Sequence, residues 1–124
     1  MTNFNDIEWH DVVINKVEIN RDKPGKLDTI SFMLEKDSTL YKLTFCNVYQ
    51  ITANLNFAVI PVEEKETINY GYCEENNENE FVKKIRRKWN GYLDKTPLKY
   101  YEIETNSTYS MYQIVAIEFT YERL

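Results

Sequence analysis

The chain offers few of the side chains that most enzymes use for catalysis. Of its 124 residues, one is histidine, two are cysteine and three are glycine. The histidine, His10, stands beside Asp11, and a histidine oriented by a carboxylate can act as a general base. Adjacent side chains on a strand point to opposite faces, so we expect this pair to contact poorly. No serine or cysteine lies in a recognisable nucleophile motif, and we therefore predict a protein that is not an enzyme.

Residues that could bind a metal ion or a cofactor are as sparse. His10, Cys46 and Cys73 lie far apart in the sequence and lack the spacing of a zinc site. The acidic residues lack the alternating pattern of a calcium loop, and the glycines are too dispersed for a phosphate-binding loop. We predict no metal and no cofactor. Both cysteines are expected to be free thiols in a reducing compartment, and the sequence leaves open whether they meet in space.

A dense acidic stretch lies in the middle of the chain. Residues 63–80 carry seven glutamates and a single lysine, a net charge of −6. Such charge would speed association with a basic protein, and tyrosine is a recurrent anchor at interfaces. A loop that only aids solubility is the alternative, and the composition by itself favours it. The candidate partner-binding residues are Glu63, Glu64, Glu66, Tyr70, Tyr72, Glu74 and Glu75.

Five basic residues between Lys83 and Lys88 suggest a nucleic-acid-binding helix. The segment 78–88 has a net charge of +3, and because the whole chain carries −5, the remainder carries −8. Phosphate groups would be repelled by so acidic a surrounding. We therefore predict a solvated helix face and no nucleic-acid binding.

The elements that must position these residues are mostly strands. Alternating apolar residues predict three strands joined by turns at 22–25 and 37–38, which gives an antiparallel meander. Their apolar faces are Val13, Val17 and Ile19; Ile30, Phe32 and Leu34; and Tyr41, Leu43 and Phe45. The pattern blurs from 48 to 62, where 55–60 fits either a buried strand or a helical turn.

The second half of the sequence predicts a fourth strand, a helix and a closing hairpin. Ile68, Tyr70 and Tyr72 alternate, and a hairpin turning at 106–107 ends in a strand with one apolar face. That face consists of Met111, Val115, Ile117, Phe119 and Tyr121. The helix is expected over 77–90, capped by Asn77, with an apolar stripe of Phe81, Val82, Ile85 and Trp89.

Together these elements predict an α+β fold, a largely antiparallel sheet of about six strands with one main helix packed on a face. Trp9 is expected at the edge of the core and Trp89 between helix and sheet. Residues 1–124 should form a single domain, since a chain of this length buries enough apolar surface to fold alone. The first nine residues contain no apolar run, and no stretch reaches the roughly 18 apolar residues of a membrane span. We expect a cytoplasmic protein that does not bind membranes.

Several short blocks of the sequence resemble a known group of proteins. These are Trp9-His10-Asp11, Pro24-Gly25 with Asp28, 45–49 (FCNVY), 55–60 (LNFAVI) and 105–108 (TNST). They resemble a family of small uncharacterised bacterial proteins, some of which look like immunity proteins of polymorphic toxin systems. The resemblance spans most of the chain and carries over no catalytic motif.

This resemblance implies a cytoplasmic, antitoxin-like binding protein. Together with the acidic stretch, it predicts a non-catalytic protein-binding domain, an immunity-type inhibitor that masks a basic toxin domain. The alternatives are a small-ligand-binding domain and a structural domain that forms homo-oligomers. A deep apolar pocket with convergent polar groups would favour a ligand, whereas an acidic or aromatic surface patch would favour a protein partner.

Overall fold

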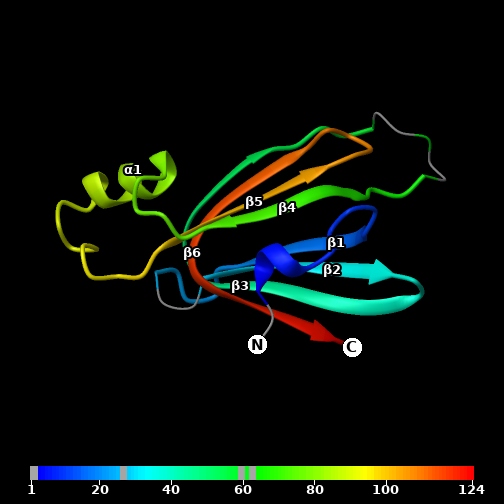
Figure 1. Ribbon diagram of the computed structural model, residues 1–124, viewed down its shortest axis with the longest axis horizontal. Helices are drawn as coiled ribbons and strands as arrows, with labels where there is room; N and C mark the ends of the chain where they lie inside the picture. The colour runs from blue at the N-terminus through cyan, green and yellow to red at the C-terminus, as the bar shows by residue number, and fades with distance from the viewer. Residues whose placement is uncertain (1–2, 26–27, 59–60, 62–63) are drawn as a thin grey trace.

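The protein is built around one six-stranded sheet in which neighbouring strands are antiparallel, in the order β1-β2-β3-β6-β5-β4 (Figure 1). The computed structural model describes residues 3–25, 28–58, 61 and 64–124. The predicted α+β fold, with about six antiparallel strands and one main helix, is confirmed. The elements are η1 (Phe4–Asp6), β1 (Val13–Asn20), β2 (Thr29–Lys36), β3 (Thr39–Asn54), β4 (Ile68–Glu74), α1 (Glu80–Lys88), β5 (Lys99–Thr105) and β6 (Met111–Arg123).

The first three strands form the predicted meander. Asp37 and Ser38 both have positive φ, 50° and 62°, as the two central residues of a type I′ hairpin turn require. The predicted apolar face of β1 is partly wrong, because the register with β2 shifts between Ile14 and Lys16. Ile14 before this bulge and Val17 after it pack against the core, whereas Ile19 is 56% exposed.

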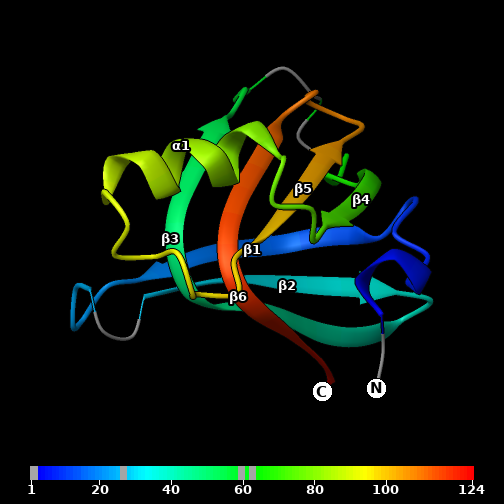
Figure 2. The same cartoon turned by 60° about the vertical axis from the view of Figure 1, so that its left-hand side comes forward.

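Strand β3 continues through residues 48–54, where the sequence pattern is irregular. The irregularity has a structural cause: Asn47 has a φ of 53°, and the register with β6 shifts between Val48 and Gln50. The alternation of faces is therefore broken, and β3 crosses from one half of the sheet to the other (Figure 2). Of the predicted block 55–60, residues 55–57 form neither strand nor helix, Ala58 lies in a bend, and 59–60 are outside the described residues.

The prediction of a single apolar face on β6 is also wrong. Phe119 and Tyr121 pack against the main core, but Val115 belongs to a second cluster under α1. Ile114 and Ala116 take the main-core positions in that half of the strand. The cause is the same break, since β6 is paired with β3 on both sides of Asn47 and bends with it.

The sheet curls until its two outer strands meet. The amide of Asp11 donates to the carbonyl of Ile68 at 2.8 Å, and the amide of Ile68 donates to Val12 at 2.8 Å. Val13 and Thr67 form an isolated antiparallel bridge beside them. Two layers of strands, visible in Figure 1, thereby enclose one core. Its buried residues are Phe4, Trp9, Val12, Ile30, Phe32, Leu34, Leu43, Phe45, Ile68, Tyr101, Ile103, Ile114 and Ala116.

Trp9, which was expected at the edge of the core, is one of its buried members. Its side chain is 3% exposed, and its indole Nε1 donates to the carbonyl of Phe4 at 3.0 Å. The indole packs against the backbone of Gly71, where an added Cβ would lie 2.7 Å from the Trp9 ring. Glycine is therefore required at position 71, because the indole of Trp9 lies so close to the backbone that any side chain there would displace it.

Helix α1 packs on the outside of the sheet, over β5 and β6 (Figure 2). It begins after Asn79 and not after Asn77: the Asn79 side chain accepts from the amides of Phe81 at 2.9 Å and Val82 at 3.3 Å. The second core holds Val82, Ile85, Leu93, Leu98, Tyr100 and Val115, and Phe81 stacks on Tyr100.

Trp89 does not pack between helix and sheet, so this prediction is wrong. It is the C-cap residue of α1 and is 51% exposed. The helix ends at Lys88, so Trp89, the last residue of the predicted apolar stripe, is not part of the helix. Leu93 and Leu98 from the following loop pack beside Ile85 instead.

The two tryptophans should therefore differ in their contribution to stability. We expect Trp9→Ala to lower the free energy of unfolding by about 3–5 kcal/mol, because it leaves a cavity in the core. Trp89→Ala, at an exposed position, should cost less than about 1 kcal/mol. Urea denaturation of both variants measures the difference, and equal losses would contradict the placement of the two side chains.

Candidate functional site

The outer surface of β4 and β5 carries a group of tyrosine and glutamate side chains. Tyr70 is paired with Glu104, and Tyr72 with Glu102. Directly paired residues of antiparallel strands share one face, and Glu74, two residues beyond Tyr72, shares it too. We call Tyr70, Tyr72, Glu74, Glu102 and Glu104 the acidic tyrosine face.

The two rows of this face continue across the sheet. Glu104 is paired with Met111 and then Asn54, and Glu102 with Gln113 and then Thr52. Each row is four strands wide, and neither contains a lysine or an arginine. The acidic charges therefore lie on β4 and β5, and the rows continue over β6 and β3 as uncharged side chains.

Hydrogen bonds fix the centre of the acidic tyrosine face. The hydroxyls of Tyr70 and Tyr100 each donate to one carboxylate oxygen of Glu102. The Gln113 amide donates to the Tyr100 hydroxyl at 3.1 Å. Burial, and then the bond to Glu102, raises the pKa of both tyrosines well above the usual value. The two hydroxyls stay protonated and hold the carboxylate in place.

The structure brings together three of the seven candidate partner-binding residues, Tyr70, Tyr72 and Glu74. Glu66 lies elsewhere and stabilises the loop after β5, where its carboxylate accepts from the amides of Ser107 at 3.2 Å and Thr108 at 3.3 Å. Glu75 forms an ion pair with Lys99 at 3.2 Å. Glu64 is exposed before β4, and Glu63 lies outside the described residues.

Sequence reasoning missed Glu102 and Glu104. Their alternation with Tyr101 and Ile103 is visible in the sequence and predicts that they point away from the core. What the sequence does not give is the register between β4 and β5, which shifts between Ile68 and Tyr70. Only that register sets the two glutamates opposite the two tyrosines.

His10 and Asp11 do contact each other, contrary to the prediction. They lie in a turn before β1, where Asp11 has a φ of 66°, and not on a strand. Their side chains approach to 3.4 Å, and both are about two-thirds exposed. The second ring nitrogen of His10 lies 3.2 Å from the backbone carbonyl of Asn69. The imidazole thus contacts a carbonyl and a carboxylate, and its contacts include no nucleophile.

Both cysteines are free and partly buried. Burial, and then the charge of Glu75, raises the pKa of the Cys73 thiol to about 11. Burial also raises the pKa of Cys46, with a smaller contribution from Glu118. A protonated thiol is a poor nucleophile, so neither side chain is activated for covalent catalysis at neutral pH.

The basic residues of α1 are partly structural. Arg86 donates to the carbonyls of Leu93 and Thr96, which holds the loop after the helix against the helix itself. Lys83 forms an ion pair with Glu78 at 3.1 Å. Lys84, Arg87 and Lys88 are exposed. The segment is therefore not one continuous cationic surface.

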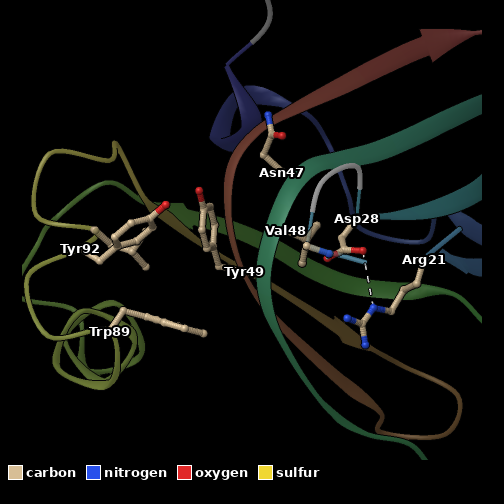
Figure 3. A pocket seen from close by; sticks show the side chains of 9 residues that line it. Arg21, Asp28, Asn47, Val48, Tyr49, Trp89 and Tyr92 are labelled. Carbon is tan, nitrogen blue, oxygen red and sulfur yellow. Dashed lines mark hydrogen bonds and ion pairs between the residues drawn. The ribbon is translucent and has the colours of Figure 1, made fainter. Parts of the chain in front are cut away.

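A pocket of about 380 Å³ lies between the end of α1, the break in β3 at Asn47 and the β1–β2 connection (Figure 3). We call it the aromatic pocket. Tyr49, Trp89 and Tyr92 line one side, and Arg21 and Asp28 line the other. None of these five was a candidate site residue, because they come from three distant segments, and Trp89 had been assigned to the core.

Two further features concern the described part of the chain only. There, no helix has both the length and the apolar character needed to cross a bilayer. In those same residues, no group of three or more histidine, cysteine, aspartate or glutamate side chains is arranged to hold a metal ion.

The raised pKa of Cys73 predicts slow alkylation. In a Cys46→Ser variant at about pH 8, Cys73 should react with iodoacetamide about a hundredfold more slowly in the folded chain than in urea, because so little thiolate is present. The neutral thiol also contributes stability below about pH 9, which is lost as the pH rises through about 11. Equal rates in the folded and unfolded chain would show that Cys73 is neither buried nor perturbed.

Comparison with known proteins assigns no family. The sequence matches no protein-family model and no curated protein. The resemblance to immunity proteins accordingly stays a prediction.

Proposed function

We propose that this chain is a cytoplasmic, non-catalytic protein-binding domain and that its acidic tyrosine face contacts a basic protein. The observation that carries the proposal is the pair of four-strand rows that contain Tyr70, Tyr72, Glu102 and Glu104 and no basic side chain. A surface of one sign attracts a partner of the opposite sign over distances of about a Debye length.

The tyrosines of this face are suited to short-range contact. Tyr72 is 41% exposed, and its hydroxyl donates to Glu74 at 3.1 Å, which restricts the orientation of the ring. Tyr70 is held by Glu102 in the same way. An aromatic side chain that is already ordered loses little conformational entropy on binding, so its buried area contributes more fully to affinity.

An apolar tip lies at one end of the same surface and could be covered by the same partner. We define it as Leu55, Phe57 and Tyr109, which are 37%, 76% and 80% exposed. Leu55 directly follows Asn54, the last residue of a face row. Asn56 donates to the carbonyls of Thr108 at 2.8 Å and Tyr109 at 3.2 Å, which joins the two loops that carry the tip.

The class of partner that fits best is a basic toxin domain, which makes the chain an immunity-type inhibitor. Two arguments support this proposal: the charge of the face and the resemblance of the sequence blocks to immunity proteins. An inhibitor of this type acts by covering its target, so it needs a complementary surface and no catalytic group.

The described side-chain contacts support a non-catalytic role. Both oxygens of Glu102 accept tyrosine hydroxyls, and the two thiols are held protonated by burial. A catalytic carboxylate or thiol would have to be available to a substrate in its reactive form.

The proposal predicts slower association when the face loses charge. The partners to test are the purified proteins encoded next to the gene of this chain. Glu74→Gln combined with Glu104→Gln should slow association with the neighbour that binds by about threefold to tenfold at low salt and should weaken the salt dependence of the rate. Stopped-flow mixing at several salt concentrations measures both effects.

A matched control is the double variant Glu118→Gln with Glu122→Gln. It removes the same charge from exposed positions on the other half of β6 and should leave the rate nearly unchanged. Urea denaturation should show similar stability for all forms. An equal effect of the two double variants would contradict the assignment of the face. If no neighbour binds and co-expression rescues no toxic neighbour, the immunity proposal is wrong.

A further inference from the structure

The aromatic pocket presents three large aromatic side chains to solvent. Tyr49 is 40% exposed, Trp89 is 51% exposed and Tyr92 is 85% exposed. Tyr49 is placed there by the break in β3, and the other two by the turns that follow α1. Figure 3 shows Tyr49 and Tyr92 next to each other, with Trp89 beneath them. Flat rings from separate segments that converge on one pocket form a surface on which a planar group can stack.

The opposite wall of the pocket carries a cation that is paired with a carboxylate. Arg21 Nε lies 3.5 Å from Oδ1 of Asp28, and the other oxygen of Asp28 accepts from the amide of Gly25 at 2.9 Å. The backbone carbonyl of Asp28 accepts from the amide of Val48 at 3.2 Å, which ties this wall to the break in β3. Asp28 thus pairs with the guanidinium on its Nε side, at ion-pair distance and without a hydrogen bond. The two terminal nitrogens of Arg21 donate to no described residue.

The Asp28 carboxylate is not itself available to a ligand. Its side chain is 18% exposed, and Oδ1 is buried without a hydrogen-bond partner among the described residues. The Arg21 side chain, in contrast, is 64% exposed. Figure 3 shows Arg21 across the pocket from the three aromatic residues, with its guanidinium below Asp28. The charge that a ligand would meet is therefore positive.

We propose that the aromatic pocket binds a small planar aromatic anion. The ring of the ligand stacks against Tyr49, Trp89 and Tyr92, and its carboxylate or phosphate accepts hydrogen bonds from the terminal nitrogens of Arg21. A guanidinium held by a carboxylate is well suited to this recognition, because its remaining N–H groups can donate in parallel to two oxygens. The volume of about 380 Å³ accommodates one or two fused rings with their anionic group.

A cationic ligand is the alternative for a cluster of aromatic rings, because ammonium groups bind to aromatic faces. Arg21 argues against it, since a second cation would be placed beside an exposed guanidinium. The inference does not depend on the proposed protein-binding function: the pocket is lined by different residues from those of the acidic tyrosine face.

The test compares three probes that share one ring system and differ in charge. These are 2-naphthoate, 2-naphthamide and 2-naphthylmethylamine, each titrated into the 15N-labelled chain and followed by NMR at the amides of Gly25 and Asn47 and the indole of Trp89. We expect 2-naphthoate to bind with a Kd of about 1 mM or tighter and the amide and amine to bind about tenfold more weakly. Tighter binding of the amine, or no saturable binding of the naphthoate, would overturn the proposal.

Two variants separate the two walls of the pocket. Arg21→Gln should weaken naphthoate binding about tenfold and leave naphthamide binding unchanged, because only the anion uses the guanidinium. Trp89→Ala should weaken both probes without unfolding the chain, since Trp89 is half exposed. The matched control is Tyr109→Ala, an exposed tyrosine outside the pocket, which should bind like the unmodified chain. Loss of naphthoate and naphthamide binding to an equal extent in Arg21→Gln would show that Arg21 only shapes the pocket and would contradict the anion assignment.

Discussion

The closed form of the sheet depends on the packing of Trp9 against Gly71. The indole can occupy its place in the core only because position 71 has no Cβ, which would lie 2.7 Å from the ring. With Trp9 in place, the residues that follow it reach Ile68 and form the hydrogen bonds that join β1 to β4. The apolar side chains of both halves then point into one core. The outer surface of β4 and β5 therefore consists of side chains that do not contribute to core packing.

The break in β3 decides what lies on that outer surface. Asn47 adopts a left-handed conformation, and the register with β6 shifts two residues later. Beyond this point, Val115 faces α1 and the helix covers one end of the outer surface, while the two rows of the acidic tyrosine face are left uncovered. The same break turns Tyr49 outward into the aromatic pocket. One local irregularity therefore separates the acidic tyrosine face, the proposed protein-binding surface, from the aromatic pocket, the proposed site for a small ligand.

The sequence predicted the features that depend on neighbouring residues. The meander and its turn at Asp37 and Ser38 follow from alternation and turn chemistry. Trp9 contributes to the core as expected, although it is buried within the core and not at its edge. Features that depend on tertiary contacts were not predictable in this way. The exposure of Trp89 depends on the cap at Asn79 and on Leu93 filling the space beneath α1, and the juxtaposition of Glu102 with Tyr70 depends on a bulge in β4. Such contacts join residues that are far apart in the chain, so local sequence patterns do not predict them.

An NMR footprint can test whether the acidic tyrosine face is the surface that contacts a protein partner, as proposed. Cross-saturation from the neighbour-encoded partner to the labelled chain identifies the residues in contact with it. We expect saturation at Tyr72, Glu74, Glu102 and Glu104, with the outward residues of β1 and β2 unaffected. A footprint centred on β1 and β2 that leaves β4 and β5 unsaturated would contradict the proposal.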